Sequence, residues 1–401
     1  MNLDVWRWLA TDPGEVLAEA AAKAEHPSVA DMMRLRKMAS GDMVAAALDL
    51  AKARRKAVFK FGERAATLVA DPVGVEMASS AAAGAWKAAR FKSAFPRGRV
   101  LDLCCGIGGD AMALAAAGLD VLPVDADPVR AWMAGMNARC PTECRDAAEV
   151  AARTPGAFHL DPARRDGSGA RAWTLDELVP GPEVIRGIID ACVHGAIKLA
   201  PGIDFAAVAA RFGTGEVEII SEAGRLTQAV LWCGVLSRAD GLRTATLLSP
   251  GPTSLTMSGP ADTDVPIAEI DAYLAEPDDS VERAELLGQL CAATGAAMIH
   301  PRLGLLTKAQ PIESPWVRGF RVLEIFPWNE RRSRDVLKRH NAGHVEVKTR
   351  GKAVNPDELQ PALSSKAGEP TVLFVLRFGR ELRAIVARRV PGGGVTVGMM
   401  P

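Results

Sequence analysis

The first part of the chain repeats small apolar and polar side chains at helical spacing. Apolar positions three and four residues apart form one face of a helix, and Ala is the strongest helix former. Ser28 and Ser40 precede two of the segments and can cap them. We expect an all-helical region over residues 1–95, with helices at Glu15–Glu25, Val29–Met38, Asp42–Phe59 and Met77–Phe91.

Short apolar runs then alternate with helical segments over residues 96–260. This alternation predicts an α/β domain with a mainly parallel sheet. The expected strands are Val100–Leu103, Asp120–Val124, Thr142–Asp146, Ala157–Leu160, Gly195–Ala200, Glu216–Ile220 and Gln228–Cys233. The last two are close enough to form a hairpin, and Arg243–Leu248 is a candidate further strand. Turn-rich sequence over residues 249–253 and 258–264 predicts the end of the domain.

Residues 261–401 mix both patterns and predict a linker followed by a small α+β domain. The 401 residues of the chain exceed the usual size of one core, so more than one domain is expected. The helices are expected at Asp278–Ala293 and Arg331–Arg339. The strands are expected at Trp316–Phe326, Val345–Arg350, Val372–Arg377 and Glu381–Val386, the last two as a hairpin.

One stretch is a candidate ligand-binding motif. It is the apolar run Val100–Leu103, which leads into Gly106 and Gly108. A strand, a glycine turn and a helix in this order let a ligand approach the backbone, and glycine accepts the positive φ that such a turn requires. The next strand ends at Asp125. An acid at this distance from the turn is where a βαβ unit presents a carboxylate to the ribose hydroxyls of a nucleoside.

Asp102, inside the end of the first strand, argues against a pyrophosphate ligand because its carboxylate would repel an anion. S-adenosylmethionine carries a sulfonium and an ammonium, which an acid attracts. The stretch resembles the first motif of class I S-adenosylmethionine-dependent methyltransferases, acid-x-Gly-x-Gly-x-Gly, with Cys104 where the first glycine is usual. The resemblance implies a Rossmann-like seven-stranded sheet and cofactor contacts from Asp102, Cys104, Gly106, Gly108, Asp125 and Asp146. An α/β turn without a ligand is the alternative.

The fourth strand ends in Asp161-Pro-Ala-Arg-Arg165, at the sheet edge where open α/β folds bind ligands. Methyltransferases that act on amino groups of bases carry a similar tetrapeptide there. Asp161 and Pro162 match it and are the candidate catalytic residues, whereas Ala163 replaces a second proline. Arg164 replaces an aromatic residue, which removes the expected stacking platform for a flipped base. Asp161 as a simple turn residue is the alternative.

Taken together, several motifs resemble a family of prokaryotic class I methyltransferases with a C-terminal THUMP-like domain. The core is also similar to the RNA cap trimethylguanosine synthase group, which methylates an exocyclic amine of guanosine. THUMP domains bind structured RNA, so the resemblance implies an RNA partner. The motifs are Lys60-Phe61, Leu103–Asp110, Asp161–Arg165, Tyr273–Pro277 with Arg283, and Lys348-Thr-Arg-Gly351.

The charge of the chain is balanced, with 48 Lys and Arg against 48 Asp and Glu, so an RNA-binding surface must be local. Residues 330–389 contain fourteen Lys and Arg against seven Asp and Glu. This excess predicts a phosphate-facing surface or, alternatively, a charged sheet edge that resists aggregation. The basic residues 52–64 are either a solvated helix face or a nucleic-acid contact.

The cysteines number seven and lack paired metal-ligand spacing, so we expect reduced thiols, no metal site and a cytoplasmic protein. No apolar run reaches membrane-spanning length, and no membrane contact is expected. Three functions remain open. They are a methyltransferase acting on a base nitrogen in RNA, a methyltransferase acting on a small molecule or protein, and an RNA-binding module that has lost catalysis.

Overall fold

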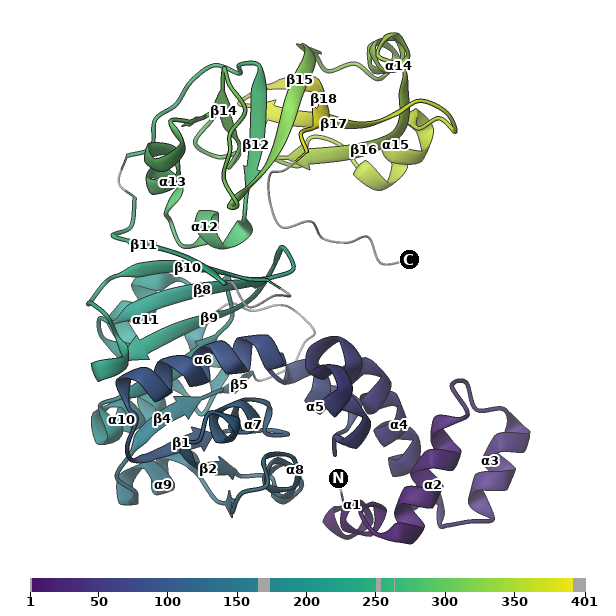
Figure 1. Ribbon diagram of the computed structural model, residues 1–401, viewed down its shortest axis with the longest axis vertical. Coiled ribbons are helices and arrows are strands. Elements are labelled where there is room, and N and C mark those ends of the chain that lie inside the picture. The colour runs from purple at the N-terminus through teal and green to yellow at the C-terminus, as the bar shows by residue number, and fades with distance from the viewer. Residues whose placement is uncertain (1, 165–173, 250–253, 263, 392–401) are drawn as a thin grey trace. The chain divides into compact units, whose positions relative to one another are not determined.

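The computed structural model describes residues 2–164, 174–249, 254–262 and 264–391 (Figure 1). The chain divides into two compact units. The first comprises residues 1–217 and 228–240, and the second comprises residues 218–227 and 241–401. Arg165, which follows the predicted tetrapeptide, and residues 250–253 of the first predicted turn-rich segment lie outside the described residues.

The N-terminal region is helical, as predicted. The helices are α1 (Leu3–Leu9), α2 (Asp12–Ala22), α3 (Val29–Arg36), α4 (Gly41–Phe61), η1 (Gly62–Thr67), α5 (Pro72–Met77) and α6 (Ala81–Ala94). The expected helix Met77–Phe91 was wrong at its start, because Met77 ends α5 and a new helix begins at Ala81. Ser80 causes this break, since its hydroxyl accepts the backbone N–H of Ala83 at 3.1 Å as an N-cap.

The α/β region alternates strands and helices after α6. Its elements are β1 (Arg99–Leu103), α7 (Gly109–Ala116), β2 (Asp120–Asp125), α8 (Pro128–Ala138), β3 (Glu143–Cys144), α9 (Ala147–Arg153), β4 (Ala157–Leu160), β5 (Ala163–Arg164), η2 (Leu175–Glu177), β6 (Leu178–Val179), α10 (Pro182–Cys192), β7 (Gly195–Leu199), α11 (Phe205–Phe212), β8 (Glu216–Glu222), β9 (Arg225–Cys233), η3 (Gly234–Leu236), β10 (Arg243–Leu248) and β11 (Leu255–Gly259).

The first sheet has the strand order β11-β10-β8-β9-β7-β4-β1-β2-β3. β1 pairs in parallel with β2 and with β4, and β4 pairs in parallel with β7. β9 pairs with β7 in the antiparallel direction. The carboxyl ends of the parallel strands therefore meet at one edge. This arrangement confirms the predicted α/β sheet. β11 lies between the two segments expected to be turn-rich and overlaps only the start of the second.

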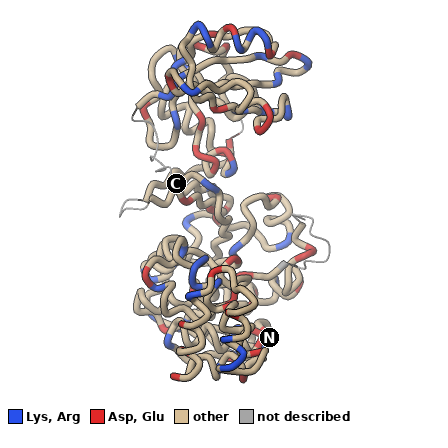
Figure 2. Tube along the Cα trace, turned by 90° about the vertical axis from the view of Figure 1, so that its right-hand side faces the viewer, with Lys and Arg blue, Asp and Glu red and all other residues tan. Residues whose placement is uncertain are grey.

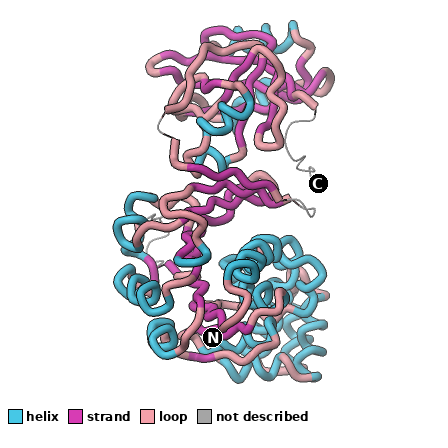
Figure 3. Tube along the Cα trace, turned by 60° about the vertical axis from the view of Figure 1, so that its left-hand side comes forward, coloured by secondary structure: helices cyan, strands magenta, loops and turns pink. Residues whose placement is uncertain are grey.

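Helices cover both faces of the parallel strands. α6, α7 and α8 pack together as one group, and α9, α10 and α11 pack together as another (Figure 1). Figure 3 shows the strands of the first unit between helices on either side. The N-terminal helices share one buried apolar cluster with Ile107, Met112, Val129 and Met133 of the α/β region. The N-terminal helices thus belong to the same core as the α/β region.

The second unit contains a mixed sheet, as predicted for a small α+β domain. Its remaining elements are β12 (Tyr273–Pro277), α12 (Asp279–Arg283), α13 (Leu287–Thr294), β13 (Ala297–Met298), β14 (Leu306–Lys308), β15 (Val317–Pro327), α14 (Glu330–Arg339), β16 (Ala342–Arg350), α15 (Pro356–Leu363), β17 (Glu369–Phe378) and β18 (Glu381–Arg389). The strand order is β13-β14-β12-β15-β18-β17-β16, in which β16 and β17 are parallel.

The central strands of this second sheet are buried on both faces. Along β17, Phe374 points into one apolar cluster, whereas Leu373 and Val375 belong to another that includes Val336 of α14. Alternate side chains of a strand face opposite ways, so the continuous apolar run fills two layers. The expected helix Asp278–Ala293 was wrong. It is split into α12 and α13, because Glu285 adopts a positive φ of 61°.

Two further observations concern membrane-spanning helices and the state of the cysteines. None of the helices in the described parts of the chain is both long and apolar enough to cross a membrane. All seven cysteines are free, and Cys105, Cys192, Cys233 and Cys291 are buried.

Candidate functional site

The turn between β1 and α7, residues 104–108, is termed the glycine turn. Cys104, Gly106 and Gly108 all adopt positive φ, at 57°, 56° and 81°. A Cβ on Gly108 would lie 2.9 Å from the Cα of Ala134, so only glycine fits there. A Cβ on Gly106 would meet no atom within 4 Å. The backbone at Gly106 therefore faces open space, where a ligand can approach it.

Asp125, at the end of β2, holds the glycine turn from the side. Its Oδ2 accepts the backbone N–H of Gly106 at 2.9 Å, and its Oδ1 accepts the N–H of Asp127 at 2.9 Å. Burial raises the pKa of Asp125, while these two N–H donors favour the ionised form. Each carboxylate oxygen has a second lone pair, so both can still accept a hydrogen bond from a ligand hydroxyl.

The predicted acids converge around Cys104. Burial, together with the negative charges of Asp125, Asp161, Asp102 and Asp146, raises the pKa of the Cys104 thiol to about 12. Asp102 and Asp125 lie at the ends of β1 and β2, and Asp146 and Asp161 follow β3 and β4. The N–H of Asp161 donates to the carbonyl of Leu103 at 3.2 Å, and the N–H of Arg145 donates to the carbonyl of Asp125 at 3.0 Å, so these strand ends adjoin. Of the four, Asp146 is exposed. Its Oδ1 caps α9 by accepting the N–H of Ala148 at 2.8 Å.

Asp102 is buried and belongs to a polar network that sequence reasoning missed. Its Oδ1 lies 2.8 Å from Nδ1 of His159 in β4, and the other His159 nitrogen lies 3.1 Å from Nζ of Lys87 in α6. The second carboxylate oxygen of Asp102, Oδ2, is buried without a hydrogen-bond partner. A buried, unpartnered carboxylate oxygen is costly, which suits a site completed by a cationic ligand.

Asp161 follows β4 and is paired with Lys198 of β7. Lys198 Nζ lies 2.7 Å from Asp161 Oδ2 and donates to the carbonyl of Met77 at 3.0 Å. Burial alone would lower the pKa of Lys198, but Asp161 and Asp110 outweigh it and raise the pKa. Lys198 is therefore an ammonium that fixes one oxygen of Asp161. The next residue, Pro162, is buried.

The link between α5 and α6 borders the same site. Nζ of Lys60 donates to the carbonyls of Val75, Glu76 and Ala78 at 2.9, 2.6 and 2.7 Å and so caps the end of α5. Lys60 was singled out in the sequence as part of a family motif, and this contact gives it a structural role. It holds the segment that supplies the Met77 carbonyl to Lys198.

Comparison with known proteins decides the family. The chain is 31% identical over 302 residues to an uncharacterized S-adenosylmethionine-dependent methyltransferase found in two strains of Mycobacterium tuberculosis. The match covers 73% of this chain and 81% of the relative. The chain belongs to the S-adenosylmethionine-dependent methyltransferases.

Three further similarities concern the methyltransferase, one over nearly the whole chain and one at each end of it. A crystal structure from Porphyromonas gingivalis W83, provisionally assigned as a methyltransferase, superposes with a TM-score of 0.71 at 16% identity. It covers 97% of this chain and 98% of that one, so the fold is shared over nearly the whole length. A family model described as THUMP domain-like matches residues 317–389, and a domain of unknown function matches residues 2–57. The methyltransferase thus has a C-terminal THUMP-like domain.

The residues present fit the cofactor of the family. S-adenosylmethionine combines a nucleoside with a cationic amino-acid end. The open backbone at Gly106 and the oxygens of Asp125 suit the nucleoside, and the unpartnered Oδ2 of Asp102 suits a cation. Cys104 and Gly108 shape the turn between these points through their positive φ.

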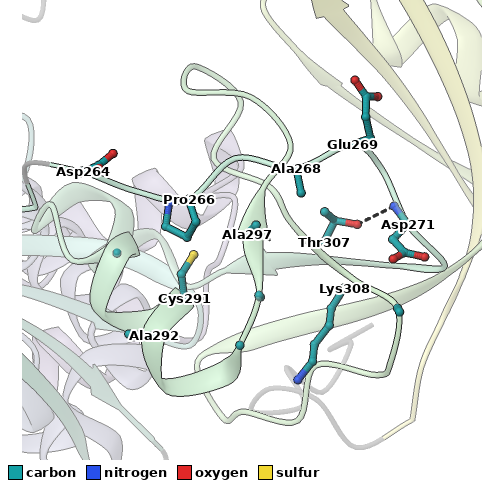
Figure 4. Close-up of a pocket in the computed structure, with 14 residues that line it drawn as sticks. Asp264, Pro266, Ala268, Glu269, Asp271, Cys291, Ala292, Ala297, Thr307 and Lys308 are labelled. Carbon is teal, nitrogen blue, oxygen red and sulfur yellow. Dashed lines mark hydrogen bonds between the residues drawn. The ribbon is translucent and has the colours of Figure 1, made fainter.

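The second unit of the methyltransferase has a cavity of its own, of about 720 Å³ (Figure 4). It lies between residues 264–271 and the elements α13, β13 and β14. Lys308 points along its edge and donates to the carbonyl of Thr294 at 2.7 Å, and the N–H of Asp271 donates to Thr307 Oγ1 at 2.8 Å. None of the predicted site residues lines this cavity.

Proposed function

We propose that this methyltransferase transfers a methyl group to a base nitrogen in RNA. In this proposal, S-adenosylmethionine contacts the glycine turn and the surrounding acids, and Asp161 with Pro162 faces the methyl acceptor. The proposed cofactor contacts are Asp102, Cys104, Gly106, Gly108, Asp125 and Asp146.

The observation that carries the proposal is the pairing of Asp161 with Lys198 beside the glycine turn. Lys198 fixes Oδ2 of Asp161 at 2.7 Å, which leaves Oδ1 to accept a hydrogen from an amino group. An exocyclic amine of guanosine has its lone pair delocalised into the ring. A hydrogen bond from that amine to Asp161 helps to localise the lone pair on nitrogen.

Little other acid–base chemistry is needed. When bound, S-adenosylmethionine supplies an electrophilic methyl group. The protein's part is to hold acceptor and donor in line and to exclude water. Asp161 orients the amine, Asp125 holds the ribose, and the link between α5 and α6 walls the site through the Met77 carbonyl. The proton lost by the amine passes to Asp161 or to solvent.

The THUMP-like match and the charge pattern of the second unit support RNA. Arg350 and Arg383 both pair in register with Leu376, so the end of β16 and the start of β18 lie at the same end of the sheet. Lys352 follows β16, and Arg380 lies in the turn before β18. In the parts of the chain that are described, Lys352 and Arg380 are exposed and form no ion pair. Arg350 is half-buried, and its positive charge acts on the carboxylates of Asp279 and Glu282, whose pKa values it lowers against the effect of burial. We assign this end of the sheet, termed the basic end, to RNA phosphates.

A second candidate is methylation of a small molecule or protein. It is favoured because other basic residues of the second unit form ion pairs. In Figure 2, basic and acidic positions are interspersed along the chain of this unit. Lys348 lies 2.9 Å from Glu276, and Arg339 lies 2.8 Å from Glu324. Such paired residues contribute to stability and leave less positive charge for a polyanion.

The test is methyl transfer by the purified full-length protein from methyl-labelled S-adenosylmethionine to total RNA, to protein extract and to a small-metabolite fraction. The proposal expects label in one modified nucleoside, identified by mass spectrometry, and its loss in Asp161→Asn. Asp176→Asn, at an exposed acid paired with Arg211, is the matched control. Label in protein or small molecules would establish the second candidate. Binding of RNA and cofactor without transfer would indicate a module that has lost catalysis.

A further inference from the structure

Five side chains meet in a buried network beneath the glycine turn. Lys87 of α6, Asp110 of α7, His159 of β4 and Asp102 of β1 are 1%, 6%, 1% and 1% exposed, and Ser79 is 5% exposed. Burying charges costs free energy unless they are paired, and a buried ion pair is weak evidence for stability alone. The arrangement of hydrogen-bond donors shows what else this network does.

Lys87 sets the direction of the hydrogen bonds. An ammonium has three donors and no acceptor. Lys87 Nζ lies 2.7 Å from Asp110 Oδ1, 3.1 Å from Ser79 Oγ and 3.1 Å from His159 Nε2. Ser79 in turn donates to Asp110 Oδ2 at 2.8 Å. Lys87 Nζ thus forms an ion pair with Asp110 and lies within hydrogen-bond distance of Ser79 and His159. Because an ammonium only donates, Nε2 of His159 must be an acceptor.

This fixes the tautomer of His159. With Nε2 as an acceptor, the ring proton is on Nδ1, which lies 2.8 Å from Asp102 Oδ1 and donates to it. Asp102 Oδ2 is left buried and unpartnered. Burial raises the pKa of Asp102, and the hydrogen bond from His159 acts in the opposite direction and favours the ionised carboxylate. When Asp102 and Asp110 are both ionised and the His159 ring is neutral, two carboxylates face one ammonium. One negative charge is then left for a cation to balance.

We propose that Lys87 and His159 are positioning residues, which hold Asp102 so that Oδ2 receives the ammonium of the amino-acid end of S-adenosylmethionine. The inference rests on the proposed cofactor site. It adds that donor affinity depends on a hydrogen-bond chain that begins in the N-terminal helical region, at α6, and passes through β4. Neither residue touches the ligand, so their effect is confined to ligands that carry the ammonium.

The experiment measures, by calorimetry on the full chain, the affinities of three ligands. S-adenosylmethionine and S-adenosylhomocysteine carry the ammonium, and 5′-methylthioadenosine keeps the nucleoside but lacks the amino-acid end. His159→Leu should weaken the first two about tenfold or more, since the lost contact is charge-assisted. Its affinity for 5′-methylthioadenosine should stay within about twofold. His159→Asn keeps a donor near the Nδ1 position and should restore most of the affinity.

Each other outcome is decisive. Unchanged affinity of His159→Leu for all three ligands would overturn the positioning role, and an equal loss for all three would show that His159 serves only the fold. If His159→Leu fails to fold, His159→Gln provides the same test. Its longer amide can still accept from Lys87, while the donor to Asp102 is lost. Failure of the parent protein to bind any of the three would instead overturn the proposed function.

Discussion

At Cys104 the side chain carries a conformational cost that glycine would avoid. A non-glycine residue at a φ of 57° is strained by roughly 1–2 kcal/mol.

Some site residues were predictable from the sequence because a short motif identifies them. They are the glycines of the turn and the acids at strand ends. Lys87, His159 and Lys198 were not predictable, because their partners are distant in the chain. The only sign in the sequence that these side chains are buried and functional is that each Lys or His stands in an otherwise apolar segment.

Asp125→Ala should weaken cofactor binding by about tenfold or more, because it removes the proposed ribose acceptors and frees the N–H of Gly106. Calorimetric titration with S-adenosylmethionine measures this loss. Asp120→Ala is the control, since Asp120 begins the same strand and only pairs at the surface with Arg99. Equal affinities in parent and Asp125→Ala would remove Asp125 from the site.

Asp161→Asn should lower transfer on the order of a hundredfold while cofactor affinity is kept, because Asp161 faces the acceptor. Lys198→Met should give a similar loss by releasing Asp161 Oδ2. Single-turnover kinetics on the RNA substrate, compared with cofactor titrations, separate the two effects. Normal turnover in Asp161→Asn would leave Asp161 as a turn residue.

Among the elements, the short helix α5 shows how a helix cap can position a segment of the candidate site. Its last carbonyls would be unsatisfied without Lys60, and the carbonyl of Met77 at its end accepts a hydrogen bond from Lys198.

Periodicity predicted long elements well, including α4 and β17. It did not define α1 as a separate helix, and it missed the strands β12, β13 and β14. These elements have at most seven residues each. Such short elements owe their stability to tertiary packing, which sequence pattern does not contain.

Lys60→Met should lower the free energy of unfolding by about 2 kcal/mol, because three carbonyls at the end of α5 lose a charged donor. Thermal unfolding followed by circular dichroism measures the change. Lys56→Met, on the same helix, removes only a surface pair with Glu76 at 3.7 Å and should cost less than about 0.5 kcal/mol. Similar losses in both variants would mean that general charge, and not capping, is responsible.

For the molecule as a whole, a net charge of zero conceals an uneven distribution. The local excess of basic residues was visible in the sequence, but ion pairing was not. Only the structure distinguishes Lys352, which is exposed and forms no ion pair among the described residues, from Arg334, which pairs with Glu330. Residues that form no ion pair release more counterions from a polyanion than residues already neutralised.

Replacing Arg350, Lys352 and Arg380 together by Gln should weaken RNA binding and flatten its salt dependence. If each contacts one phosphate, the slope should fall by about 0.7 logarithmic units per residue for a single strand. Fluorescence anisotropy over a range of salt concentrations measures both. The paired residues Arg334 and Arg339, replaced by Gln, should leave the slope unchanged. An unaltered slope in the triple variant would favour a small-molecule or protein acceptor.

The first unit includes residues 228–240, which follow residues 1–217 in the chain after a segment that belongs to the second unit. During synthesis, β7 leaves the ribosome before β9, which later pairs along it. A nascent chain that ends before residue 228 therefore carries β7 as an open sheet edge, with unpaired N–H and C=O groups that invite aggregation. Ribosomes stalled at that point should hold chains that recruit chaperones, and this recruitment should decline once residue 240 has emerged.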